Sequence, residues 1–122
     1  MAQPETHLRA VKYEVSVFTD AMRDAPTSAM DARSWAITVA DRGHGKWAVI
    51  LGAHDGDMLE VLGADGEWDF EPRPSSRTDE WLASHRFDLD TALKLAAEQA
   101  PLVTLNGLTA LDVFAKRAGV GD

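Results

Sequence analysis

The stretch SWAITVADRGHGKWAVIL, residues 34 to 51, decides the fold of this chain. Its first part alternates, with Trp35, Ile37 and Val39 on one face, which predicts a strand over Ser34–Ala40. Its last part, Lys46–Leu51, is apolar on both faces, which is typical of a strand in the middle of a sheet. The glycine-rich segment between the two predicts a hairpin loop, so these strands pair antiparallel.

The neighbouring segments extend this sheet. Period-two alternation and β-branched residues predict three more strands, at Val11–Phe18, Met58–Leu62 and Glu67–Phe70. The dipeptide Asp65-Gly66 predicts a tight hairpin between the last two strands. The segment Thr19–Arg33 shows no clear period, and we interpret it as a long connection.

Helical signals follow the prolines of residues 71–77. Thr78 and Asp88 are candidate N-caps, and the second of these begins a helix over Leu89–Gln99 that Pro101 ends. Residues 102–105 predict a short strand and Asn106-Gly107 a tight turn. The capping-box pattern at Thr109–Asp112 then begins a last helix, which runs to about residue 118.

The predicted fold class is therefore α+β, with an antiparallel sheet of four to five strands and two to three helices packed on one face. The length of 122 residues suits one domain. We expect a flexible leader at residues 1–10 and a single α+β domain at residues 11–122. The chain has no cysteine and no apolar run long enough to span a bilayer, so we expect a cytoplasmic protein.

The formal net charge is −8, and it is concentrated in one tract. Residues 65–90 hold eight acids and only three arginines. Such a charge disfavours binding to nucleic acid or to anionic membranes, because that binding needs clustered lysines and arginines. It permits binding to a basic partner.

No catalytic or metal-binding pattern is complete. The acids at Asp55-Gly56-Asp57 and between residues 65 and 71 lack the spacing of an EF-hand loop, and the four histidines lack the spacing of a zinc site. Ser84, His85 and Asp79 are the residue types of a catalytic triad, but helix neighbours diverge by about 100°. We therefore expect His85 to be a helix-end residue, and we expect no catalytic residue, cofactor or metal.

The loop Gly43–Lys46 is a second candidate for chemistry. Its backbone donors and the lysine are suited to a phosphate group. It joins two strands and does not open a helix, however, so the sequence favours a plain hairpin turn.

Two of the four tryptophans, Trp68 and Trp81, stand among acidic residues. We weigh two roles for them: bridges between the sheet and the first helix, or anchors of a binding surface with an acidic rim.

Several segments resemble a group of small uncharacterised proteins encoded by phages of actinobacteria and by prophages in their hosts. The resemblance covers about Trp35 to Ala110 and is carried by WAITV, by R-G-x-G-x-W-A-V at residues 42–49, by DGEWDFEPRPSSRTDEWLASHRFDLDTAL at residues 65–93, and by A-P-x-V-T-x-N-G-x-T-A at residues 100–110. The group has no established activity, so the resemblance assigns no site residue. It implies an accessory protein that works in bacterial cytoplasm.

From these observations we expect a non-enzymatic binding module for a host macromolecule, most simply a host protein. Arginine and tryptophan dominate protein interfaces, and the candidate contact residues are Trp68, Asp69, Glu71, Arg73, Arg77, Glu80 and Trp81. Three alternatives stay open: an acidic mimic of nucleic acid that inhibits a DNA-binding enzyme, a small enzyme with carboxylate chemistry, and a homo-oligomeric structural protein. In the last case, an exposed edge strand at Val11–Phe18 would pair across a dimer axis.

Overall fold

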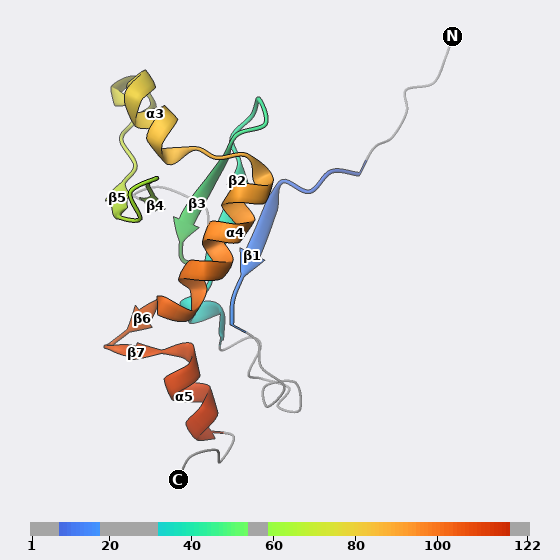
Figure 1. The fold of residues 1–122 in the computed structure, drawn as a ribbon, viewed down its shortest axis with the longest axis vertical. Coiled ribbons are helices and arrows are strands. Elements are labelled where there is room, and N and C mark those ends of the chain that lie inside the picture. The colour runs from blue at the N-terminus through green and yellow to red at the C-terminus, as the bar shows by residue number, and fades with distance from the viewer. Residues whose placement is uncertain (1–7, 18–31, 54–58, 118–122) are drawn as a thin grey trace.

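The structure is a computed structural model that describes residues 8–17, 32–53 and 59–117. A five-stranded antiparallel sheet forms its centre, in the order β1-β2-β3-β4-β5 (Figure 1). The strands are β1 Lys12–Val15, β2 Ile37–Asp41, β3 Trp47–Leu51, β4 Glu60–Leu62 and β5 Trp68–Phe70. The middle position of β3 confirms the prediction from its two apolar faces, because both of its sides are buried.

Among the described residues, three helices and a small second sheet accompany this sheet in the α+β fold. The helices are α3 Asp79–His85, α4 Leu89–Gln99 and α5 Ala110–Arg117. Short 3-10 turns lie at η1 Ala32–Trp35, η2 Pro74–Ser76 and η3 Ala100–Leu102, and the second sheet pairs β6 Thr104–Leu105 with β7 Leu108–Thr109. Among the described residues, none of the helices has the length and apolarity that crossing a bilayer requires.

Each helix starts at a side-chain cap that the sequence predicted. The Thr78 hydroxyl accepts a hydrogen bond from the Trp81 amide at 3.0 Å, and Asp88 Oδ1 accepts one from the Thr91 amide at 2.8 Å. At α5 the capping box is reciprocal. The Thr109 amide donates to Asp112 Oδ2 at 2.9 Å, and the Asp112 amide donates to the Thr109 hydroxyl at 3.2 Å. These bonds satisfy amides that the first turn of a helix leaves without partners.

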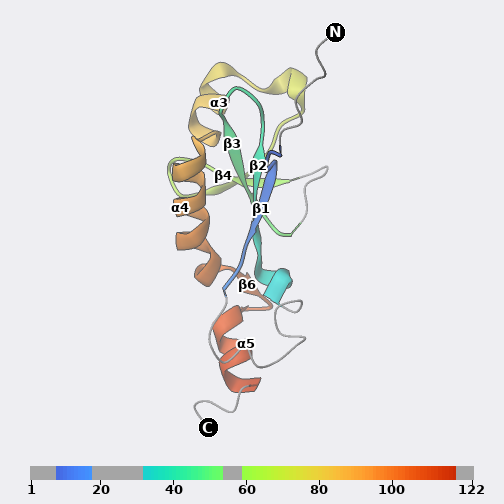
Figure 2. The same cartoon turned by 90° about the vertical axis from the view of Figure 1, so that its right-hand side faces the viewer.

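The apolar residues of the sheet divide into two clusters by strand alternation. Helix α4 lies along one face of the sheet (Figures 1 and 2). There its small residues pack on the larger residues of the strands, and this cluster consists of Ile37, Val39, Trp47, Val49, Leu62, Ala92, Ala96 and Ala100. The residues of opposite parity form the second cluster, against which Trp81 of α3 packs: Ala40, Ala48, Ile50, Leu59 and Val61. The two clusters show that this sheet is buried on both faces at its centre.

Trp35 is buried as predicted, but it does not lie in a strand. It ends η1, and β2 begins two residues later at Ile37. Its indole Nε1 donates a hydrogen bond to the Leu108 carbonyl at 2.8 Å, and the ring packs against Ala110. A buried indole N–H needs such an acceptor, and the bond fixes the start of β2 to the second sheet.

Several sequence predictions fall on residues outside the described ranges. They are the leader up to residue 7, Phe18, most of the connection at residues 19–31, the turn at residues 54–57 and Met58. Residues 32 and 33 of that connection belong to η1.

Candidate functional site

The acidic tract of residues 65–90 includes β5, which ends the order of the sheet. Side chains alternate between the two faces of a strand. Asp69 is paired with Val61 and faces α3, whereas Trp68 is paired with Leu62 and packs toward α4. Phe70 therefore shares the face of Trp68. Glu71 follows directly after the strand and reaches the arginines on the α3 side.

Glu71 is the centre of a buried ionic group. One carboxylate oxygen, Oε1, pairs with Arg86 Nη2, and the other, Oε2, pairs with Arg77 Nη2 at 3.2 Å. Only 8% of the Glu71 side chain and 6% of the Arg86 side chain are exposed. Arg77 Nε also donates to the Pro72 carbonyl at 2.9 Å, which closes the proline-containing linker into a compact turn. A buried charge needs this kind of pairing.

The position of Arg86 has an electrostatic consequence. Burial is the main cause that lowers the pKa of Arg86, and the hydrogen bond and charge of Glu71 oppose this effect. The cations Arg42 and Arg77 lower the pKa further. An arginine keeps its charge in proteins even so, and Glu71 is the counter-charge of Arg86.

Trp81 is the apolar platform of the same region. The His85 ring stacks on its indole with centroids 4.2 Å apart and planes 4° apart. The Arg86 guanidinium carbon lies 5.2 Å from the indole centroid, which is within cation–π range. Because Trp81 also packs on the second apolar cluster, it bridges the sheet to α3.

His85 joins the end of α3 to β5. Its Nε2 lies 2.8 Å from Asp69 Oδ2, and its Nδ1 lies 2.8 Å from the Trp81 carbonyl and 2.7 Å from the Ser84 hydroxyl. The carboxylate and the carbonyl are both acceptors, so the doubly protonated ring satisfies both contacts. In the neutral ring, Nε2–H still donates to Asp69, and Nδ1 accepts from the Ser84 hydroxyl.

The backbone holds the end of α3 in the same place. The Ala64 amide donates to the Ser84 carbonyl at 2.7 Å. Gly63 leaves room for the His85 ring, because a Cβ atom at Gly63 would lie 3.1 Å from Nε2 and 2.8 Å from Asp65 Oδ1. The β4–β5 hairpin and the end of α3 are therefore one packed unit.

The expectation that Ser84 and His85 diverge is wrong. His85 is the last residue of α3, as predicted, and its ring turns back toward the Trp81 carbonyl, where the Ser84 hydroxyl also points. The carboxylate that joins them is Asp69, whereas Asp79 lies in the first turn of α3. The Ser84 proton also has the Trp81 carbonyl as an acceptor at 3.0 Å, and His85 is only 7% exposed. These contacts hold the end of α3 in place.

The candidate contact residues thus divide into two groups. Asp69, Glu71, Arg77 and Trp81 have the intramolecular partners described above, and Trp68 is half-buried against the α4 cluster. Arg73 and Glu80 are exposed.

Sequence reasoning missed Phe70, which is 67% exposed on β5. The sequence pattern predicts it at the end of a short strand and assigns it no role. The ring is exposed because α4 lies over the strands at the centre of the sheet and not over β5 (Figure 1).

The described residues contain no group of three or more histidine and acidic side chains that could hold a metal ion. The acids at residues 55 and 57 lie outside them. Comparison of the chain with protein-family models, curated proteins and solved structures gives no match.

Proposed function

We propose that this protein is a non-enzymatic binding module that contacts another protein through the β5 surface, which we define as Asp69, Phe70, Arg73 and Glu80. The observation that carries the proposal is the exposure of Phe70. A large aromatic ring that is two-thirds exposed at a sheet edge loses apolar contact with water when a partner covers it.

The backbone of β5 supports the same proposal. The Glu71 amide donates to the Leu59 carbonyl, and the Gly63 amide donates to the Glu67 carbonyl. By the alternation of an antiparallel ladder, the backbone groups of Phe70 point away from β4, toward the open edge. An open edge with an exposed side chain is a recurring docking element for an extended segment of a partner.

Ionic contacts on the α3 side of β5 hold this strand in a fixed position. Asp69 and Glu71 flank Phe70, and both are held from the α3 side by His85 and Arg86. A contact residue that is fixed before binding loses less conformational entropy on association. We include the exposed charged residues Arg73 and Glu80 of the same tract as the polar rim of the β5 surface.

The resemblance to phage-encoded proteins supports a host protein as the partner and the host cytoplasm as the setting. The alternative of an acidic nucleic-acid mimic has less support, because several acids of the tract already have intramolecular partners. Asp65 accepts from the Glu67 amide, Asp69 contacts His85, Glu71 pairs with two arginines and Asp88 caps α4. An array that imitates phosphates needs its carboxylates directed outward.

The test is a tagged capture from nuclease-treated actinobacterial lysate at low and at high salt, followed by reconstitution with the purified partner. We expect one host protein that stays bound at high salt and forms a defined complex with the purified chain. Capture of basic DNA-handling proteins that are lost at high salt would favour the mimic instead. No reconstituted complex at either salt concentration would contradict the proposal.

A further inference from the structure

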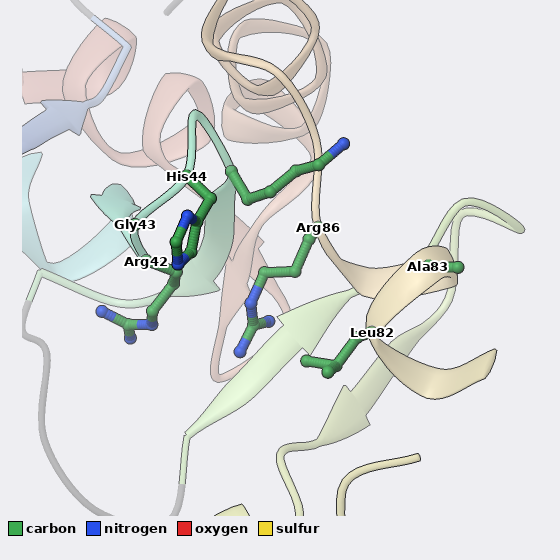
Figure 3. A pocket seen from close by; sticks show the side chains of 7 residues that line it. Arg42, Gly43, His44, Leu82, Ala83 and Arg86 are labelled. Carbon is green, nitrogen blue, oxygen red and sulfur yellow. The ribbon is translucent and has the colours of Figure 1, made fainter. Parts of the chain in front are cut away.

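A cavity of about 420 Å³ lies between the β2–β3 hairpin loop and the end of α3 (Figure 3). It is lined by Arg42, Gly43, His44, Lys46, Leu82, Ala83 and Arg86. It is separate from the β5 surface, none of whose residues belongs to the lining. The loop that sequence reasoning assigned to a plain turn therefore also forms one wall of a cavity.

The charge of this lining is opposite to that of the chain. Two arginines, a lysine and a histidine contribute to it, and no acid does, although the chain as a whole carries a formal charge of −8. Such local focusing of positive charge in a concave site raises the local concentration of anions.

Among the described residues, three acids lie beside lining residues, and each has hydrogen-bond or ionic partners of its own. Asp41 accepts from the Gly43 amide at 2.8 Å and pairs with Arg9 at 3.4 Å. Glu71 is shared between Arg77 and Arg86, and Asp88 caps α4 through the Thr91 amide. Glu71 is the counter-charge of Arg86, and the charge of Lys46 contributes to lowering the pKa of Asp88. The lining itself contributes basic side chains and no acid.

Arg86 is the least solvated of these cations. It is 8% exposed, and the charge of Arg42 opposes its own. Its Nη1 donates to the His85 carbonyl at 3.0 Å and its Nη2 contacts Glu71, which fixes the guanidinium plane. Figure 3 shows the His44 ring and the Arg86 guanidinium between the hairpin loop and Leu82.

The loop backbone fixes the wall opposite α3. Three consecutive residues, Gly43, His44 and Gly45, have positive φ angles of 87°, 56° and 72°. Glycine adopts this conformation without strain, and the Lys46 amide closes the turn by donating to the Gly43 carbonyl at 3.0 Å. The two glycines therefore allow His44 and Lys46 to stand at the cavity from one short turn.

We propose that this cavity binds a small organic phosphate monoester. Arginine and lysine are the side chains that bind phosphate oxygens best. The volume is in the range of sites for organic ligands and exceeds the need of a phosphate ion alone. Leu82 and Ala83 supply an apolar wall for the organic part.

The test is an NMR titration of the ¹⁵N-labelled full chain in low-salt buffer with AMP, ribose 5-phosphate, inorganic phosphate and adenosine. We expect both monoesters to shift the amides of residues 42–46 and 82–86, with a lower dissociation constant than inorganic phosphate. Adenosine, which lacks the phosphate, leaves these amides in place. Lys46→Gln weakens monoester binding by about tenfold, because it removes one charged contact.

The matched control is Lys94→Gln, which removes the same charge from an exposed position on α4 outside the lining. It leaves the dissociation constant unchanged. Absence of shifts with both monoesters overturns the proposal. So does equal weakening by the two variants, or inorganic phosphate that binds as tightly as the monoesters. Because Lys46 and Lys94 lie outside the β5 surface, failure here leaves the protein-binding proposal untouched.

Discussion

At the scale of single residues, Glu71 connects parts of the acidic tract that are far apart in the sequence. Its two oxygens join β5 to Arg77 in the linker and to Arg86 after α3. The sequence supplies acids and arginines here but not their pairing, because the partners lie 6 and 15 positions away and only the folded chain brings them together.

We predict that Glu71→Ala destabilises the protein by about 3 kcal/mol, because it leaves Arg86 buried without its counter-charge. Urea unfolding followed by circular dichroism measures this loss. The control is Glu67→Ala, at an exposed position in the same hairpin, which changes the free energy of unfolding by less than about 0.5 kcal/mol. Equal effects of the two substitutions would show that the ionic group contributes no stability.

Asp88 gives a prediction on pH. Hydrogen bonds from the backbone and side chain of Thr91 lower the pKa of Asp88, and Thr109 lowers the pKa of Asp112 in the same way. A carboxylate whose pKa is lower in the folded state adds stability above its ordinary value of about 3.9, and this stability is lost as the pH falls through the folded-state pKa.

We therefore expect Asp88→Asn to flatten the acid side of the stability profile, measured as the free energy of unfolding between neutral pH and the acid transition. Asp90→Asn is the control, since Asp90 lies in the same turn but is not the capping residue. A profile for Asp88→Asn that runs parallel to that of the unsubstituted protein would refute the role of this cap.

At the scale of elements, signals between residues close in the sequence were sufficient to predict most of the helices, strands and turns. The caps at Thr78, Asp88 and Thr109 involve contacts three residues apart, so the sequence displays both partners. The turn at Asn106-Gly107 likewise has the positive φ angles, 54° and 79°, that these residue types favour.

The strand predicted at Trp35 was wrong because of a long-range contact. Its strand-like alternation with Ile37 is real, but its hydrogen-bond acceptor lies 73 positions further along the chain. Alternation cannot reveal such a partner. The position of Phe70 has a similar cause, since the extent of α4 over the sheet is a tertiary property.

We predict that Trp35→Phe loosens the C-terminal elements more than the sheet. The substitution leaves the Leu108 carbonyl without its donor, at a cost of about 1 kcal/mol. Hydrogen exchange should become faster in β7 and α5, while the amides of β2 and β3 keep their protection. Faster exchange spread evenly over all these elements would contradict this role of Trp35.

At the scale of the whole molecule, charge is distributed in a way that the composition conceals. The net charge of −8 argues against anionic partners, yet the folded chain gathers Arg42, Lys46 and Arg86 around one cavity. The acidic tract, which looks from its sequence like one continuous binding surface, separates into inward-facing ionic contacts and an exposed edge. The sequence predicted the location of the tract but not this division, because the division depends on the face to which each residue of β5 points.

The central claim is that Phe70 contacts a partner and not the core. The most direct measurement is the affinity of the reconstituted complex for Phe70→Ser against Leu102→Ser, at two apolar positions of nearly equal exposure, 67% and 66%. We predict that both variants unfold at the temperature of the unsubstituted protein and that only Phe70→Ser loses binding, by at least about a hundredfold. Unchanged affinity of Phe70→Ser, or a large drop in its melting temperature, would contradict the claim.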